Sequence, residues 1–500
     1  MENNLEKYFS KFRKNIIGID AEFETPYGKQ KMIYADWIAS GRLYEPIERV
    51  MSEKFGPQIG NTHSEASETG VIMTRAYKFA QQIIKQHVNA SEQDCIITSG
   101  SGMTRVVNKL QRILGLKLPD ENSFYNRVTG MNLNHVDIDD YNKPIVFVTH
   151  TEHHSNHFSW LETICDVEII SFTEDLKVDI NAFKELLKKY DYKKLKIGAF
   201  SAGSNVTGYF PPVDELAQLM HQNNGLCFVD FAASAPYIEI NMHKNDEKGI
   251  YYDAIYFSPH KFLGGPGSAA VLVFNKSLYR NINPDNPGGG TVIWTSPWNE
   301  IVYSENIEIR EDGGTPAFLQ TIRTALAIRL KEQMGVENIE KREEQLISKA
   351  FEELSKIEAI HILAKNETHR LGVVSFYSDK MNQNLITKIL NDRFGVQVRG
   401  GCSCAGPYGH YLLKLNRDIS NSIKRKILEG DSTSKPGWVR ISLHPTMTDK
   451  ELKYVIEAIK QIHDNAEEWS KDYYQDKDSG EFFHKDIPFD HTRVEKMFKI

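Results

Sequence analysis

The segment YFSPHKFLGGPGS (residues 256–268) places one lysine, Lys261, between an apolar run and a glycine-rich turn. The apolar residues that precede Ser258 predict a buried strand. A lysine that follows a buried strand among small residues can be desolvated, which makes its amine nucleophilic toward an aldehyde. A lysine that ends a strand and faces water is the simpler alternative, and the local sequence leaves both interpretations open.

Similar apolar runs, each bounded by turn residues, recur along the chain. They are DCIITSG (94–100), KPIVFVTH (143–150), KLKIGAFS (194–201), GLCFVDF (225–231), YDAIYFS (252–258) and AAVLVF (269–274). Helical patterns lie between several of them, such as MTRVVNKLQRILG (103–115), in which Val106, Leu110 and Ile113 share one face. This alternation predicts an α/β domain built on a mainly parallel central sheet.

The C-terminal part has a different pattern, in which the strand-like KPGWVRISLH (435–444) lies between RFGVQVRGG (393–401) and a helical segment at 449–464. This pattern predicts a second, smaller α+β domain. We expect an N-terminal arm over residues 1–32, a large cofactor-binding domain over 33–334, the smaller domain over 335–465, to which the N-terminal segment could also contribute, and a polar extension over 466–500.

The composition is that of an ordinary globular protein, with 40% hydrophobic and 25% charged residues and a net charge of −7. This charge argues against a nucleic-acid partner, because affinity for phosphate backbones comes from clustered Lys and Arg. The charged start lacks the apolar core of a signal peptide and the apolar runs are too short to span a bilayer, so we expect a cytoplasmic protein without membrane contact. The odd count of 5 cysteines predicts reduced thiols.

A carboxylate, Asp230, ends the apolar run of VDFAASAP (229–236), 31 residues before Lys261. Pyridoxal phosphate (PLP) acts as an electron sink when its pyridine nitrogen stays protonated, which requires a nearby carboxylate. Ligands of open α/β sheets bind at the carboxyl ends of the parallel strands, where Asp230 is expected. The alternative is an aspartate that caps a helix.

A strand-to-helix junction lies in TSGSGMTRVVN (98–108), where Gly102, Met103 and Thr104 open a helix. The free N–H groups and the positive end of this helix predict an anion site, so the backbone and Thr104 are candidates to hold a phosphate. Glycine turns before helices are frequent, and the pattern alone does not identify the ligand. The lysine of a nucleotide-binding P-loop does not follow, which weighs against a nucleotide.

Four histidines, His150, His153, His154 and His157, lie within THTEHHSNHFSW (149–160). Imidazole is a common metal ligand, so a metal site is the obvious alternative. The HExxH pattern is absent and acidic ligands are sparse, so we predict no metal here. A histidine stacked on an aromatic cofactor fits better with the other motifs.

Two cysteines, Cys402 and Cys404, lie in the glycine-rich VRGGCSCAGPYGH (398–410). Thiols on a polar loop are accessible and can react as thiolates, whereas structural cysteines are usually buried in regular elements. A metal-binding pair or a redox dithiol is the alternative. Further on, Arg440 alternates with its apolar neighbours and points to the opposite strand face, where its guanidinium can bind a carboxylate or face solvent.

Together and in chain order, the segments EHHSN (152–156), SPHK (258–261) and RGGCSCAGP (399–407) resemble the class V aminotransferases of PLP fold-type I, most closely the cysteine desulfurase and selenocysteine lyase group. The resemblance covers roughly residues 33–465. It implies a PLP enzyme with a large domain on a mainly parallel central sheet, a smaller C-terminal α+β domain, and a homodimer.

The resemblance also implies roles for single residues. Lys261 would form the Schiff base with PLP and move the proton at the substrate α-carbon, Asp230 would pair with the pyridinium, and His153 would stack over the ring. Thr104, Ser258 and His260 would hold the phosphate, and Thr315 would reach it from the neighbouring subunit. Asn205 would lie beside the cofactor oxygen and the substrate, and Arg440 would bind the substrate carboxylate.

Cys404 aligns with the cysteine that forms a persulfide in this group, which implies that it takes sulfur from L-cysteine or a related amino acid and releases alanine. A sulfur-acceptor protein is then a candidate partner. Two features depart from the group: Ala233 replaces a glutamine, and Cys402 and Ser403 replace a pair of histidines. Cys402 could form a disulfide with Cys404, which would release sulfur or inhibit the enzyme.

Two other functions remain open at this point. One is a different class V reaction that does not use the thiol, such as that of an aminotransferase, an epimerase or a kynureninase-like lyase. The other is a metal-binding or scaffold protein that keeps the fold without catalysis.

Overall fold

The computed structural model describes residues 4–62, 65–120, 122–129, 138–488 and 490–499. Its large domain is built on a seven-stranded sheet with the strand order β4-β10-β9-β8-β7-β5-β6. Strands β5 to β9 run parallel, and β10 runs antiparallel to both of its neighbours. The strands are β4 (Asp94–Thr98), β5 (Ile145–Val148), β6 (Asp166–Ile169), β7 (Lys196–Ser201), β8 (Leu226–Asp230), β9 (Ala254–Phe257) and β10 (Val271–Asn275). The predicted α/β fold with a mainly parallel sheet is confirmed.

The central strands are apolar along their whole length because both faces of the sheet are covered. Ile145 and Phe147 of β5 enter one hydrophobic core, while Val146 and Val148 enter the other. This alternation follows from the two-residue repeat of a strand. The helices of the large domain are α3 (Glu68–His87), α4 (Met103–Ile113), α5 (Phe124–Thr129), α6 (His154–Leu161), α7 (Ile180–Lys189), α8 (Val213–Gln222), α9 (Ile307–Arg310) and α10 (Phe318–Met334).

The smaller domain has a four-stranded antiparallel sheet in the order β13-β14-β17-β16. Its strands are β13 (Ile360–Ile362), β14 (Val373–Ser378), β16 (Arg399–Gly401) and β17 (Trp438–Ser442), and its longer helices are α11 (Val336–Leu354), α12 (Gln383–Phe394) and α15 (Asp449–Asp464). A capping box of Thr448 and Glu451 fixes the start of α15. The predicted α+β character of this part of the chain is confirmed.

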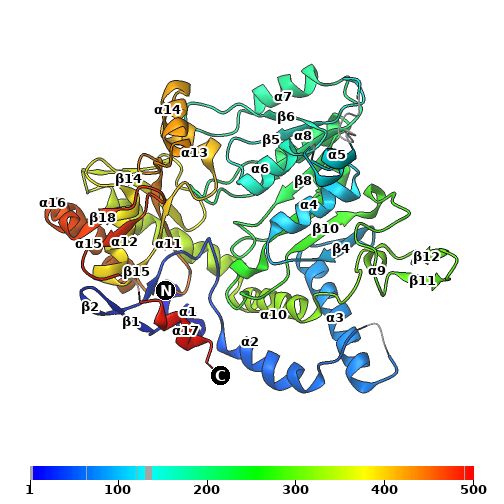
Figure 1. Cartoon of the computed structure of the whole chain (residues 1–500), viewed down its shortest axis with the longest axis horizontal. Coiled ribbons are helices and arrows are strands. Elements are labelled where there is room, and N and C mark those ends of the chain that lie inside the picture. Colours follow the sequence, from blue (N-terminus) through cyan, green and yellow to red (C-terminus); the bar gives the residue numbers. More distant parts are fainter. Residues whose placement is uncertain (1–3, 63–64, 121, 130–137, 489, 500) are drawn as a thin grey trace.

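The N-terminal segment packs on the smaller domain (Figure 1). Helix α1 (Leu5–Arg13) contacts α11, and β3 (Ile33–Tyr34) pairs in parallel with β15 (Val396–Gln397). A further bridge joins Asp36 to Ser442 at the end of β17. These contacts bring Asp36 beside the strand that carries the predicted substrate-binding arginine. The remaining N-terminal elements are β1 (Glu22–Thr25), β2 (Gly28–Lys31) and α2 (Glu45–Arg49).

Three segments extend beyond the two main sheets and their covering helices. The hairpin of β11 (Val292–Thr295) and β12 (Ile301–Tyr303) projects from the large domain at the right of Figure 1. Helices α13 (Gly406–Leu412) and α14 (Arg417–Leu428) lie between β16 and β17 in the chain and are at the top of the same view. The C-terminal hairpin, β18 (Tyr473–Gln475) and β19 (Phe482–His484), contacts α12. Two short helices flank it, α16 (Ala466–Trp469) and α17 (Thr492–Met497).

Among the helices in the described residues, none combines the length and the apolar character needed to cross a membrane.

Candidate active site

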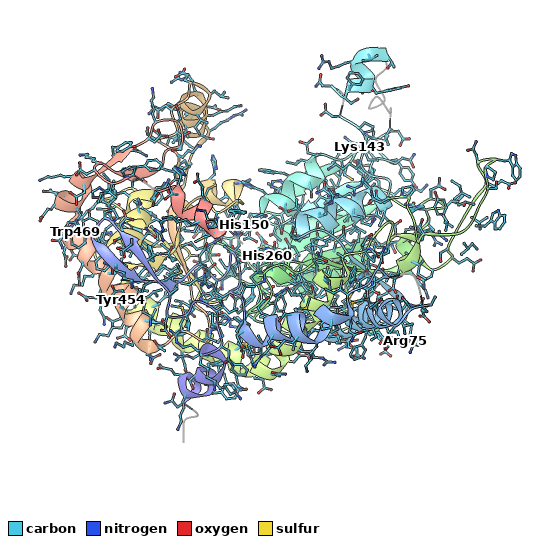
Figure 2. The ribbon with its side chains drawn as sticks, turned by 60° about the horizontal axis from the view of Figure 1, so that its bottom comes forward. Arg75, Lys143, His150, His260, Tyr454 and Trp469 are labelled. Carbon is cyan, nitrogen blue, oxygen red and sulfur yellow. The ribbon has the colours of Figure 1, made fainter. Side chains whose placement is uncertain are left out.

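A cavity of about 240 Å³ lies between the two domains, at the carboxyl ends of the parallel strands. Figure 2 shows one of its residues, His260, near the middle of the molecule. The predicted site residues that line this cavity are Gly102, Met103, Thr104, His153, Asn205, Asp230, Ser258, His260, Lys261, Cys404 and Arg440. The position agrees with the rule that ligands of open α/β sheets bind beyond the carboxyl ends of the strands.

Lys261 is positioned by a short 3-10 turn, Pro259–Lys261, directly after β9. Gly265 lets the chain fold back on this turn, because a Cβ at residue 265 would lie 1.9 Å from the carbonyl oxygen of Pro259. The glycine-rich sequence after the lysine is therefore a steric requirement of the turn. Burial lowers the pKa of Lys261, and the nearby Asp230 carboxylate opposes this shift. A lysine with a lowered pKa is a better nucleophile near neutral pH.

Asp230 is the last residue of β8 and is buried, with one carboxylate oxygen accepting a hydrogen bond of 2.7 Å from the Ala232 N–H. Burial raises its pKa, and the buried Glu152 adds to that shift, whereas Lys261 lowers it. A protonated ring nitrogen beside Asp230 would supply the counter-charge that this carboxylate needs in order to stay ionised.

Glu152 is buried next to the cavity wall, and its carboxylate accepts hydrogen bonds from three residues. Ser201 donates through its backbone N–H at 3.0 Å and its hydroxyl at 2.6 Å, Asn156 donates at 2.7 Å, and Thr149 donates through its hydroxyl at 2.7 Å. Ser201 itself lines the cavity. This carboxyl group therefore holds Ser201 in place on the cavity wall. The sequence shows only a glutamate beside histidines, so this role was not predicted.

Helix α4 points its N-terminus at the cavity. Gly102 occupies the N-cap position without a capping side chain, and the Met103 N–H donates to the Ser258 hydroxyl at 2.9 Å. The Thr104 and Ser155 hydroxyls lie 2.7 Å apart on the cavity wall. Backbone N–H groups and hydroxyls at a helix N-terminus form an anion site. Burial lowers the pKa of the adjacent His260 to about 4, so this imidazole is neutral near pH 7.

His153 caps α6 and is neutral as well. Its Nδ1 accepts a hydrogen bond of 3.1 Å from the Ser155 N–H, which fixes the ring, and burial lowers its pKa to about 3. The neighbouring histidines bond elsewhere: His150 Nε2 lies 2.9 Å from the Leu176 carbonyl, and His154 Nε2 accepts from the Gly406 N–H at 2.7 Å. In the part of the chain that the structure describes, His153 is the member of this group that lines the cavity.

Arg440 enters the cavity from β17 and is held by Asp36. One guanidinium nitrogen donates to Asp36 at 2.9 Å and another donates to the Asn205 carbonyl at 3.1 Å. Arg399 binds the second oxygen of Asp36 at 3.0 Å. The Nε of Arg440 is buried and has no hydrogen-bond partner among the described residues. Asp36 was not predicted, because 404 residues separate it from Arg440 and no motif surrounds it.

The two cysteines lie on a tight turn that contacts the large domain. The Cys402 carbonyl accepts from the Ala405 N–H at 3.1 Å, and Ser403 and Cys404 adopt left-handed φ angles of 51° and 57°. The turn is held by the His154 N–H, which donates to the Cys404 carbonyl at 2.9 Å, and by the Asn205 amide, which donates to the Ser403 carbonyl at 2.8 Å. Both thiols are exposed, and Cys404 lines the cavity.

The other three cysteines differ from this pair. Cys95, Cys165 and Cys227 are buried, and burial raises the pKa of each, to about 11 for the first two. Their thiols are therefore poor candidates for thiolate chemistry.

Thr315 does not line the cavity of its own chain and is exposed at the surface. Ala233, at the position where a glutamine was expected by resemblance, is part of the cavity wall.

The donor set of the cavity fits PLP. The N-terminus of α4 suits a phosphate, the Lys261 amine suits an aldehyde, Asp230 suits a protonated ring nitrogen, and the neutral His153 ring suits an aromatic face. The Ser403 hydroxyl, which also lines the cavity, is buried without a hydrogen-bond partner among the described residues. Such an unpaired polar group is expected where a polar ligand binds.

A buried lysine, a strand-end carboxylate and an anion-binding helix at the carboxyl ends of the strands of an α/β sheet define a PLP-dependent enzyme of fold-type I. The family model described as "Aminotransferase class-V" matches residues 142–455. The chain therefore belongs to the class V aminotransferase family of PLP-dependent enzymes, which confirms the resemblance seen in its motifs.

Similar proteins are named as cysteine desulfurases. A probable cysteine desulfurase of Halalkalibacterium halodurans is 26% identical over 385 residues, which cover 76% of this chain and 86% of that protein. A probable cysteine desulfurase of Mycobacterium leprae is 28% identical over 385 residues, with coverage of 76% and 84%.

Solved structures of cysteine desulfurases share the fold. The apo enzyme of Thermococcus onnurineus superposes with a TM-score of 0.68 at 22% identity, covering 90% of this chain and 97% of that one. A cysteine desulfurase of Escherichia coli gives a TM-score of 0.68 at 18% identity, with coverage of 91% and 98%.

Proposed function

We propose that this protein binds PLP and removes the sulfur of L-cysteine, or of a closely related amino acid, to give alanine and a persulfide on Cys404. The observation that carries the proposal is the position of Cys404 in the same cavity as Lys261 and Arg440. An accessible thiol at that position has a role in a desulfurase and none in a plain aminotransferase. The names of the similar proteins support the same reaction.

PLP, when bound, withdraws electrons from the substrate and so eases the bond changes at its carbons. Arg440 binds the substrate carboxylate and Asn205 lies beside the cofactor oxygen and the substrate; the hydrogen bond from Arg440 to the Asn205 carbonyl keeps these two residues together. Lys261 takes the proton from the α-carbon and returns it there, for which its lowered pKa suits it.

Cys404 completes the reaction as the nucleophile. Its thiolate attacks the substrate sulfur, a sulfur–sulfur bond forms, and the carbon–sulfur bond breaks with its electron pair going to the substrate carbon. Protonation of that carbon gives alanine, while the sulfur stays on the enzyme as a persulfide. Atoms and charges balance, because one cysteine and one thiol become one alanine and one persulfide.

We infer a homodimer as well. The β11–β12 hairpin exposes large apolar side chains: Ile293, Trp294, Trp298, Ile301 and Val302. Exposed patches of this kind are typical of a protein interface. Thr315 lies exposed in the segment that follows the hairpin, and this location supports its proposed contact with the phosphate bound by a second copy.

Incubation of the PLP-loaded protein with a panel of amino acids tests the proposal. L-cysteine is expected to give alanine and protein-bound persulfide in equal amounts, and Cys404→Ser is expected to give neither. Persulfide and alanine formed at an unchanged rate by Cys404→Ser would remove the assigned role of the thiol. Transamination or hydrolysis of another amino acid, with cysteine inert, would instead identify a different class V reaction.

A further inference from the structure

A second cavity adjoins the cysteine turn, and Cys402 lines it while Cys404 lines the first. Its volume is about 530 Å³. Apolar side chains dominate its walls, among them Leu413, Ile423, Ile427 and Trp438. Among the described residues, the Trp438 Nε1 is buried and has no hydrogen-bond partner. The two cysteines of one turn thus lie on the walls of two different cavities.

Helix α14 forms one wall of the second cavity but does not fill it. Ile419, Ile423 and Ile427 recur every four residues and share one side of the helix, with Lys424 and Arg425 among the polar residues around them. An amphipathic helix normally buries its apolar side, yet no residue of α14 is fully buried. Its apolar side therefore borders a space that the described residues do not fill.

The turn keeps the backbones of the two cysteines close together. Two residues span at most about 7 Å of backbone, so the Cys402 and Cys404 Cα atoms are closer than that in any conformation. Both thiols are free and exposed. The left-handed φ angles at Ser403 and Cys404 are uncommon for residues with side chains, and such strain is typical of functional loops.

We propose that Cys402 is a second sulfur-carrying residue that takes the sulfur from Cys404 and presents it to a thiol acceptor in the second cavity. This step rests on the proposed function, since it begins with the Cys404 persulfide. The Cys402 thiolate attacks the outer sulfur of that persulfide, a new sulfur–sulfur bond forms on Cys402, and the old one breaks so that Cys404 leaves as a thiolate. The transfer needs no oxidant or reductant, because one thiolate and one persulfide are present before and after.

The transfer separates the removal of sulfur from the substrate from its delivery to the acceptor. Cys404 returns to its thiolate form in the first cavity and can accept sulfur from the next substrate. The acceptor then meets the sulfur in a cavity that PLP and the substrate do not occupy.

The number of alanine molecules formed without any added thiol tests the relay. The PLP-loaded protein is mixed with excess L-cysteine, and alanine and the persulfide positions are measured after rapid alkylation, by fragment mass spectrometry. Because L-cysteine is itself a thiol, the reaction is quenched within the first turnovers. The wild type is expected to form two equivalents of alanine per subunit in the burst, with persulfide on both cysteines. Cys402→Ser is expected to stop at one equivalent, with all of the persulfide on Cys404.

Two results would overturn the relay. One is a burst of equal size in the wild type and Cys402→Ser, with sulfur on Cys404 alone. The other is a Cys402–Cys404 disulfide with release of sulfide, because the second cysteine would then expel the sulfur and not carry it. If no alanine forms from cysteine in any variant, the proposed function itself fails, and this outcome is distinct from both.

The role of the cavity has its own test. Ile423→Trp fills the second cavity, and it is expected to slow the transfer of sulfur from Cys402 to dithiothreitol about tenfold or more by blocking access. Ile419→Trp is the matched control, since Ile419 lies on the same helix, is 45% exposed and does not line the cavity. Equal transfer rates in the two variants would show that the acceptor does not enter by this cavity.

Discussion

Asp36 should be a main determinant of both stability and substrate binding, because it holds two arginines with one carboxylate. Arg440 is the decisive partner: its side chain is 3% exposed and its distance to Asp36 is 2.9 Å. Removal of one member of a buried ion pair costs about 3–5 kcal/mol. Arg399 is 52% exposed, so its share is screened by solvent and adds at most about 1 kcal/mol.

We expect Asp36→Ala to lower the free energy of unfolding by about 3 kcal/mol, since Arg440 keeps its bond to the Asn205 carbonyl and part of the loss is offset. The KM for cysteine should rise about tenfold, because the Arg440 guanidinium, which we propose binds the substrate carboxylate, is no longer fixed. Asp36→Asn keeps an acceptor and should lose about half as much stability.

Urea denaturation followed by circular dichroism, with PLP bound, measures the first effect, and steady-state alanine formation measures the second. The control is Asp20→Ala, which breaks the exposed Lys31 pair at 2.6 Å and should cost less than about 0.5 kcal/mol. If Asp36→Ala is no less stable than this control and binds cysteine equally well, the role assigned to Asp36 is wrong.

Three other perturbations probe the ring-nitrogen partner, the buried histidines and the exposed hairpin. Asp230→Asn should keep the fold but lower kcat/KM about 100-fold, because an amide cannot hold a ring nitrogen protonated; steady-state kinetics measure this, and an unchanged rate would contradict the pairing. The free energy of unfolding should fall as the pH drops below about 6.5. The pKa values of His150 and His153 are lowered to about 4 and about 3 in the folded protein, so between these values and pH 6.5 only the unfolded chain takes up the protons. A lower urea midpoint at pH 5 than at pH 7.5 is the expected result. Trp294→Glu together with Trp298→Glu should dissociate the proposed dimer and weaken PLP binding, which sedimentation and cofactor absorbance report; a dimer that survives both changes would place the interface elsewhere.

The sequence predicted the parts of the molecule that depend on local pattern. Apolar runs and glycine turns indicate the strands of the sheet and the junctions after them, so the pattern alone places Lys261, Asp230 and Thr104 next to strand ends, where the structure has them. Asp36 and Glu152 were not predicted, because each acts through partners far away in the chain or through a hydrogen-bond network that only the fold assembles. Helix α14 was also missed, since its apolar residues belong to no motif and resemble those of any surface helix.

One departure from the cysteine desulfurase pattern, the pair Cys402 and Ser403, lies in the cysteine turn, whereas the other, Ala233, lines the first cavity. The residue pair that replaces two histidines, Cys402 and Ser403, begins the tight turn, and helices α13 and α14 follow it in the chain. An extra cysteine without a cavity, or a cavity without a thiol, would have no evident use in sulfur chemistry. Because both occur together, next to a cavity that holds the other cysteine, the proposed relay concerns how the sulfur leaves the enzyme and not how it is taken from the substrate.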